Sequence, residues 1–186
     1  MLLTGRRVLI TGGSDSHGDL NLRRRTYLPL LHVGESHSHT LGCARTVVKA
    51  LSSKKEDILD GISSGRSVVT DGPFLDLTVD AGEGVCGIGD TVGSKAATVR
   101  AHAVTSREFG NLRDVIVYGG RTDGLGEDTV LEYSDADNDA SGKYEYCVEI
   151  RANLEPYRYL RGECRVENDA VCLTNPVWIR SQASDQ

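Results

Sequence analysis

One short motif in the sequence has residue types that could bind a metal ion. It is the stretch GGSDSHGD at residues 12–19, in which Asp15 and His17 follow an apolar run. A carboxylate oxygen and an imidazole nitrogen are ligands of zinc, manganese and iron, and glycine lets the backbone approach an ion closely. A zinc-type site normally needs three or more protein ligands, so Asp15 and His17 are candidate metal ligands that require others. The alternative is that Asp15 caps the following turn and His17 only forms a hydrogen bond.

A pair of histidines further along the chain could supply the missing ligands. His37 and His39 lie in the stretch GESHSHT, and alternate residues of an extended segment point to the same side. Together with Asp15 and His17 they would make a four-ligand set. The alternative is a polar surface loop whose histidines bind nothing.

An acidic stretch, SDADNDASGKYEY, partly matches a calcium-binding loop. Asp135, Asp137 and Asp139 occupy the first, third and fifth positions of such a loop. The glycine expected at the sixth position is instead Gly142 at the eighth, and Tyr146 replaces the carboxylate at the twelfth. The sequence therefore favours an acidic hairpin turn over a calcium site.

Net charge and cysteine content exclude several classes of function. The 186 residues carry a formal net charge of −6, whereas phosphate backbones need a basic surface, so no nucleic acid is expected as a partner. No stretch is long and apolar enough to span a membrane, and the N-terminus lacks the apolar segment of a signal peptide. The five cysteines contain no C-x-x-C pair and are expected to be reduced, which predicts a cytoplasmic protein.

The first part of the chain is expected to contain one strand and a long loop. The apolar run RRVLIT at residues 6–11, stopped by two glycines, is typical of a strand buried on both faces. Residues 18–50 are polar and irregular, which predicts a loop with a short strand at RTVVKAL.

One helix is predicted in the stretch SSKKEDILDGISSG. Ser52 or Ser53 is the expected N-cap, Glu56 is the capping-box partner, and Gly65 ends the helix. Its expected apolar stripe consists of Ile58, Leu59 and Ile62.

From residue 66 onward the apolar pattern changes to period two. Runs such as FLDLTVD, ATVRAHAVT and KYEYCVEI recur every eight to fifteen residues with turn residues between them, which predicts an antiparallel β-sandwich. The stretch YGGR at residues 118–121 is predicted to be a β-turn. Arg161, Glu163 and Arg165 alternate along one predicted strand, as in a solvated charge ladder or a subunit contact.

The sequence therefore predicts an α+β chain that is mostly β. Residues 1–72 form a small α/β part, residues 73–180 form the β-sandwich, and residues 181–186 are a disordered tail. One strand and one helix cannot bury a core by themselves, so another body must cover residues 1–72. Unpaired strand edges also predict self-association into a homo-oligomer.

Several motifs in combination resemble the C-terminal part of PHP-type metallohydrolases, the polymerase and histidinol phosphatase superfamily, and most of all its CehA/McbA-like branch. The motifs are GGSDSHGD, GCARTVV, ILDGISSGRSVVTDGPFLDLTV, GDTV, YLRGEC and LTNPVWI. The resemblance extends from about residue 8 to residue 180.

The resemblance implies a specific architecture and chemistry. In this family a distorted α/β barrel ends in a strand with the G-S-D-x-H motif, and a helix and a small β-sandwich follow. Residues 1–72 would then be the remnant of that barrel, and Asp15 and His17 would match the last two metal ligands. The other ligands of the family lie in a barrel that this sequence does not contain, and the pair His37 and His39 does not match them.

Three functions are therefore considered. The first is the C-terminal segment of a metal-dependent phosphoesterase or esterase, which binds Zn, Mn or Fe and is inactive without an upstream PHP barrel or a second copy. The second is a non-catalytic β-sandwich that serves as a binding or oligomerisation module. The third is a domain stabilised by calcium.

Overall fold

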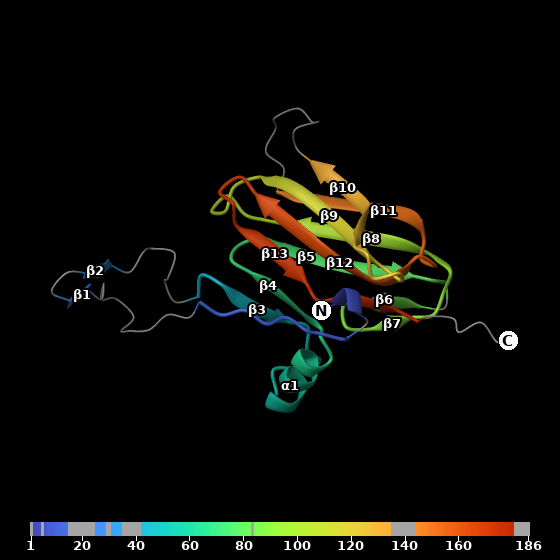
Figure 1. Ribbon diagram of the computed structural model, residues 1–186, viewed down its shortest axis with the longest axis horizontal. Helices are drawn as coiled ribbons and strands as arrows, with labels where there is room; N and C mark the ends of the chain where they lie inside the picture. The colour runs from blue at the N-terminus through green and yellow to red at the C-terminus, as the bar shows by residue number, and fades with distance from the viewer. Residues whose placement is uncertain are drawn as a thin grey trace.

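The structure of the chain is a computed structural model. It describes residues 2–4, 6–14, 25–28, 31–34, 42–82, 84–134 and 144–180, and for residues 25–28 and 31–34 it describes the backbone alone. These residues form one α-helix and two antiparallel sheets that share a core, so the predicted, mostly β fold is confirmed (Figure 1). No helix in this part of the chain has the length and apolar character needed to cross a membrane.

The larger sheet contains eight strands. Their main order is β10 (Glu127–Ser134), β9 (Leu112–Arg121), β12 (Tyr157–Val166), β13 (Val171–Thr174), β4 (Ser67–Thr70) and β3 (Arg45–Val48). Beside this path, β14 (Val177–Ile179) pairs antiparallel with β12 and parallel with β7 (Thr91–Val92).

The smaller sheet contains four strands in the order β11 (Glu145–Asn153), β8 (Ala96–Val104), β5 (Phe74–Asp80) and β6 (Val85–Gly87). A separate pair of strands consists of β1 (Arg25–Leu28) and β2 (Leu31–Gly34). The remaining elements are the short 3₁₀ helix η1 (Leu2–Thr4) and the helix α1 (Lys55–Ser63).

The core lies between the two sheets. Alternate residues of β5 and β8 are buried, as the period-two pattern predicts, and they belong to one cluster with buried residues of β9 and β12. The sheets meet closely at Gly162, where an added Cβ would lie 2.6 Å from Leu75 Cδ2. The strands β3 and β4 from residues 1–72 are hydrogen-bonded into the larger sheet, beside β13.

The predicted turn at residues 118–121 is wrong, because these residues lie inside β9. Two aromatic rings explain the glycines there. A Cβ on Gly119 would lie 2.6 Å from Tyr157 Cδ1, and a Cβ on Gly120 would lie 2.1 Å from Tyr159 Cε1. The glycines therefore make room for rings from the neighbouring strand β12, which a local turn pattern does not reveal.

The predicted strand at residues 6–11 is also not formed, since the segment has no strand pairing. Its residues are exposed or half-buried instead of buried on both faces. Side chains of the larger sheet bind its backbone polar groups in place of a neighbouring strand. The short strand predicted at RTVVKAL is confirmed as β3.

The predicted helix is confirmed as α1, and its end is formed as expected. Gly65 has φ +75°, its N–H donates to Ile62 O, and the N–H of Arg66 donates to Gly61 O. The N-cap differs from the prediction, because the capping position is Lys54, which makes no side-chain cap. Ser52 instead donates a hydrogen bond to Asp57.

The apolar stripe of α1 does not face the sandwich core. Ile58 is 36% exposed and Leu59 is 53% exposed. The buried residue of the helix is Gly61, where an added Cβ would lie 2.6 Å from Val48 Cγ1 of β3. The helix therefore contacts the sheet through a glycine and leaves apolar side chains in solvent.

We expect Gly120→Ala to lower the free energy of unfolding by about 1–3 kcal/mol, since the methyl group overlaps the Tyr159 ring. Urea unfolding followed by circular dichroism measures this change. Gly126→Ala is the control, because a Cβ there meets nothing within 4 Å. Equal effects of the two substitutions would contradict the packing role of Gly120.

Candidate functional site

The segment that leads to the predicted metal ligands is fastened to the sandwich. We call residues 6–14 the N-terminal strap. The N–H of Ile10 donates to Asn175 Oδ1 at 2.7 Å, and Asn175 Nδ2 donates to Ile10 O at 3.1 Å and to Ser67 O at 3.0 Å. Asn175 is fully buried, so its amide has no competing water. One side chain thus joins the strap to β4 and to the turn between β13 and β14.

A second side chain fastens the strap two residues later. The N–H of Gly12 donates to Thr46 Oγ1 at 2.8 Å, and the Thr46 hydroxyl donates to Gly12 O at 2.9 Å. Only glycine fits at this position, because a Cβ on Gly12 would lie 2.3 Å from Val69 Cγ1. The hydroxyl of Thr46 on the edge strand β3 therefore pairs with both backbone polar groups of Gly12, as a neighbouring strand would otherwise do.

The start of the strap contacts the short strands β7 and β14 of the larger sheet. The Arg7 guanidinium lies 5.0 Å from the centroid of the Trp178 ring on β14, and it donates to Thr91 Oγ1 on β7 at 3.0 Å. The strap thus extends from β7 and β14 to β3.

The predicted ligands themselves lie outside the described residues. This holds for Asp15 and His17, for His37 and His39, and for the acidic stretch with Asp135, Asp137 and Asp139. Within the described ranges, no group of three or more His, Cys, Asp or Glu side chains is arranged to bind a metal ion. The described part of the chain therefore supplies no ligand set of its own.

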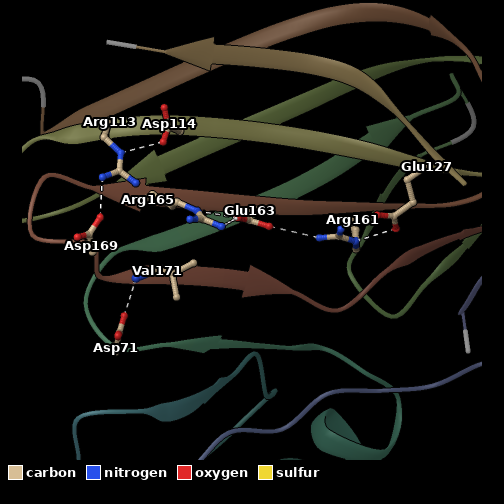
Figure 2. A network of polar contacts seen from close by, with 9 residues as sticks. All are labelled: Asp71, Arg113, Asp114, Glu127, Arg161, Glu163, Arg165, Asp169 and Val171. Atoms are coloured by element: carbon tan, nitrogen blue, oxygen red, sulfur yellow. Dashed lines mark hydrogen bonds and ion pairs between the residues drawn. The ribbon is translucent and has the colours of Figure 1, made fainter. Parts of the chain in front are cut away.

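The outer face of the larger sheet carries a chain of ion pairs (Figure 2). We call it the polar ladder. Arg165 Nε donates to Glu163 Oε1 at 2.8 Å, and Glu163 Oε2 lies 3.7 Å from Arg161 Nη1. Arg161 continues the chain through Nε, which donates to Glu127 Oε1 at 2.8 Å. The alternation predicted along β12 is thus a ladder that extends to β10.

Glu127 is held by two side chains of β12. It accepts hydrogen bonds from Arg161 and, at 2.7 Å, from the hydroxyl of the buried Tyr159. Burial alone would raise the pKa of Glu127, but the hydrogen bonds from Arg161 and Tyr159 outweigh it, so the pKa is lowered. Arg161 also lies 4.4 Å from the centroid of the Tyr118 ring. The ladder therefore holds Glu127 in its charged form.

A separate group of ion pairs lies near the turn between β12 and β13 (Figure 2). Arg113 bonds Asp114 at 2.9 Å and Asp169 at 2.7 Å, and Asp169 occupies a left-handed turn position with φ 65°. Directly after β4, Asp71 accepts the N–H of Val171 at 2.6 Å. These contacts join the turn between β12 and β13, and the start of β13, to the neighbouring strands β9 and β4.

The polar ladder has a structural role. Its two arginines, Arg161 and Arg165, already have carboxylate partners, and so does the nearby Arg113. A cation that is paired in this way is not available to an anionic ligand without losing its partner. Sequence patterns missed Glu127 because its partners are 32 and 34 residues away, and they missed Asn175 because its role depends on the strap.

Comparison of the chain with protein-family models, with curated proteins and with solved structures gives no match.

We expect Asn175→Ala to lower the free energy of unfolding by at least about 2 kcal/mol, because it removes the side-chain partner of the N–H and C=O of Ile10 and of the buried Ser67 hydroxyl. Trypsin cleavage after Arg7, followed by mass spectrometry, should become faster as the strap detaches. Asn153→Ala is the matched control, since Asn153 is exposed and bonds only locally to the N–H of Glu155. Unchanged cleavage and stability in Asn175→Ala would contradict the fastening role.

Glu127 gives an expected dependence of stability on pH. Because its folded-state pKa is lowered, its stabilising effect is present above the ordinary value of 4.5 and is lost as the pH falls through the folded-state pKa. The difference in unfolding free energy between wild type and Glu127→Gln should therefore shrink below that value. Urea unfolding over a pH series measures it, with the exposed Glu132→Gln on β10 as the charge-matched control. A constant difference would contradict this account.

Proposed function

We propose that this chain is the C-terminal segment of a PHP-like metal-dependent hydrolase of the phosphoesterase or esterase type, and that it is inactive by itself. In this proposal Asp15 and His17 contribute two ligands to a Zn, Mn or Fe site whose other ligands come from an upstream PHP barrel or from a second copy. A bound metal of this kind lowers the pKa of its water and so supplies a nucleophile near neutral pH.

The observation that supports the proposal is the fastening of the N-terminal strap. The motifs of the resemblance are far apart in sequence, yet three of them contribute contacts to the strap. Thr46 comes from GCARTVV and bonds Gly12, Val69 comes from GRSVVT and lies against Gly12, and Asn175 comes from LTNPVWI and bonds Ile10. Because Asn175 binds the backbone of Ile10 and Thr46 binds the backbone of Gly12, the position of the chain just before Asp15 is fixed.

Exposed apolar side chains in residues 1–72 also support the proposal, because an upstream barrel would cover them. Val47, Leu51, Ile58 and Leu59 lie on β3, on α1 and in the segment between them, and they are 36% to 93% exposed. In the proposed enzyme this barrel remnant would bury them against the rest of the barrel. The free state of all five cysteines agrees with a cytoplasmic location.

The same exposed side chains favour the alternative function, a non-catalytic binding or oligomerisation module. In that case a second copy or another protein covers them, and Asp15 and His17 bind no metal.

The decisive experiment is metal analysis of the purified chain after incubation with Zn²⁺, Mn²⁺ or Fe²⁺ and removal of unbound ions. We expect weak, substoichiometric metal that disappears in Asp15→Ala and in His17→Ala, and no hydrolysis of p-nitrophenyl phosphate. Asp135→Ala is the control for non-specific binding to acidic residues, and it should leave the retained metal unchanged.

Two outcomes would contradict the proposal. Metal retention that is the same in the wild type, Asp15→Ala and His17→Ala would show that these residues bind no metal. The non-catalytic module would then be the remaining function, and light scattering would test whether it forms a homo-oligomer. Stoichiometric metal with turnover in the unaided chain would instead show that the segment is a complete enzyme.

A further inference from the structure

The strand β11 (Glu145–Asn153) is one edge of the smaller sheet. It pairs with β8 over all nine of its residues without a register shift, and no described strand pairs with its other side. Natural proteins blunt such an edge with proline, lysine, a bulge or a short strand. The sequence of β11, EYCVEIRAN, contains neither proline nor lysine. A long and regular row of backbone hydrogen-bonding groups is therefore left open along this strand.

The other sheet edges in the described part of the chain are short or irregular. The strand β3 has four residues, and β6 and β7 have three and two. The strand β10 has eight residues, but its register with β9 shifts between Thr129 and Leu131. These edges have the protection that β11 lacks, so β11 is the edge that best fits a partner strand.

The apolar side chains on the core side of β11 are incompletely covered. On the neighbouring strands β8 and β5, core-facing side chains such as Val99 and Leu77 are fully buried. The core-facing side chains of β11 pack against the same core but stay half-buried; they are Tyr146, Val148, Ile150 and Ala152. A partner that adds apolar side chains beside them would remove this surface from water, which is favourable.

Hydrogen bonds at the two ends of β11 show which backbone groups face the open edge. The N–H of Thr105 donates to Tyr144 O, and the N–H of Leu154 donates to Lys95 O. Residues of an antiparallel pair alternate in the side to which their N–H and C=O point, so the even-numbered residues of β11 bond to β8. The odd-numbered residues direct their N–H and C=O outward. A further antiparallel strand must therefore bond to the odd-numbered residues.

A second copy of β11 matches this edge in charge. If a twofold axis passes through Val148, Glu145 of each copy is directly opposite Arg151 of the other, and Cys147 is opposite Glu149. Among the described residues Arg151 has no ion-pair partner, although its neighbours Glu145 and Glu149 are paired with side chains of β8. The second copy would thus supply a carboxylate to each unpaired arginine.

The same register joins the half-buried apolar rows of the two copies. Val148 is opposite its own copy, and Tyr146 is opposite Ile150. The ring of Tyr146 is already stacked on Tyr133 of β10, with the ring centroids 4.1 Å apart, so little side-chain freedom remains to be lost on pairing. Pairing in this register would therefore continue the core across the axis.

Neighbouring registers that also bond odd-numbered residues fit less well. An axis at Cys147 places Glu145 opposite Glu149, and an axis at Glu149 places that residue opposite its own copy. Like charges directly opposite each other are destabilising. An axis at Ile150 avoids this repulsion, but it leaves Tyr146 outside the paired segment. The register centred on Val148 is thus favoured by both charge and apolar contact.

We propose that the chain forms a twofold-symmetric dimer through β11, in which two smaller sheets join into one continuous antiparallel sheet with the axis at Val148. The partner is a second copy of this chain. This interface is distinct from the exposed apolar side chains of β3 and α1, and it does not depend on whether Asp15 and His17 bind a metal.

The test is sedimentation velocity of the full chain from about 1 μM to 1 mM, with a reductant present so that Cys147 forms no disulfide. We expect the wild type to pass from monomer to dimer within this range. Arg151→Glu places like charges opposite each other at both ends of the interface and should weaken the dimer about tenfold to a hundredfold, and so should Glu145→Arg. The double variant with both substitutions restores opposite charges and should dimerise about as well as the wild type.

Arg45→Glu is the matched control, because it makes the same charge change at an exposed arginine of the edge strand β3 and should leave the dimer unchanged. A wild type that stays monomeric over the whole range would overturn the proposal. A dimer that is weakened by Arg45→Glu but not by Arg151→Glu would overturn the interface at β11. A double variant that stays as weak as the single ones would overturn the register at Val148. Circular dichroism of each variant should show an intact sandwich, since Glu145 and Arg151 are exposed.

Discussion

The buried amide of Asn175 bonds to Ile10, which is 165 residues away, and to Ser67, which is 108 residues away. A buried amide without partners costs free energy, so its place in the core is stable only when the strap and β4 are both present. This requirement couples the two ends of the chain. It also explains why the strap keeps a fixed path without strand pairing, since Asn175 and Thr46 replace the ladder that a neighbouring strand would provide.

Charged side chains are arranged differently on the two outer faces of the sandwich. On the larger sheet the charges neutralise one another along the polar ladder, and Glu127 and Glu163 are mostly covered by arginines. On the smaller sheet the pairs Arg100–Glu149 and His102–Glu145 are more exposed. Exposed pairs add little to stability, because water screens them. The polar ladder on the larger sheet is therefore expected to contribute more to stability than the pairs on the smaller sheet.

Much of the fold was predictable, because period-two alternation reports directly which residues face a core. The prediction from sequence failed mainly at glycines. Gly120 looks like a turn in sequence, but its size is required by Tyr159 from a strand about forty residues later, and local patterns carry no such information. The segment at residues 6–11 is as apolar as a strand, yet its backbone is bound by the side chain of Asn175 instead of by a partner strand. The candidate ligands were identified by residue type alone, and their companions depend on tertiary contacts that spacing does not encode.

The long separation between Ile10 and Asn175 also bears on synthesis. At about 5–20 residues per second, a ribosome needs on the order of ten seconds to pass from one to the other. During that interval Thr46 is already available to Gly12, but Ile10 has no Asn175 amide to bind. The strap can therefore take its complete path across the sandwich only after Asn175 has been synthesised.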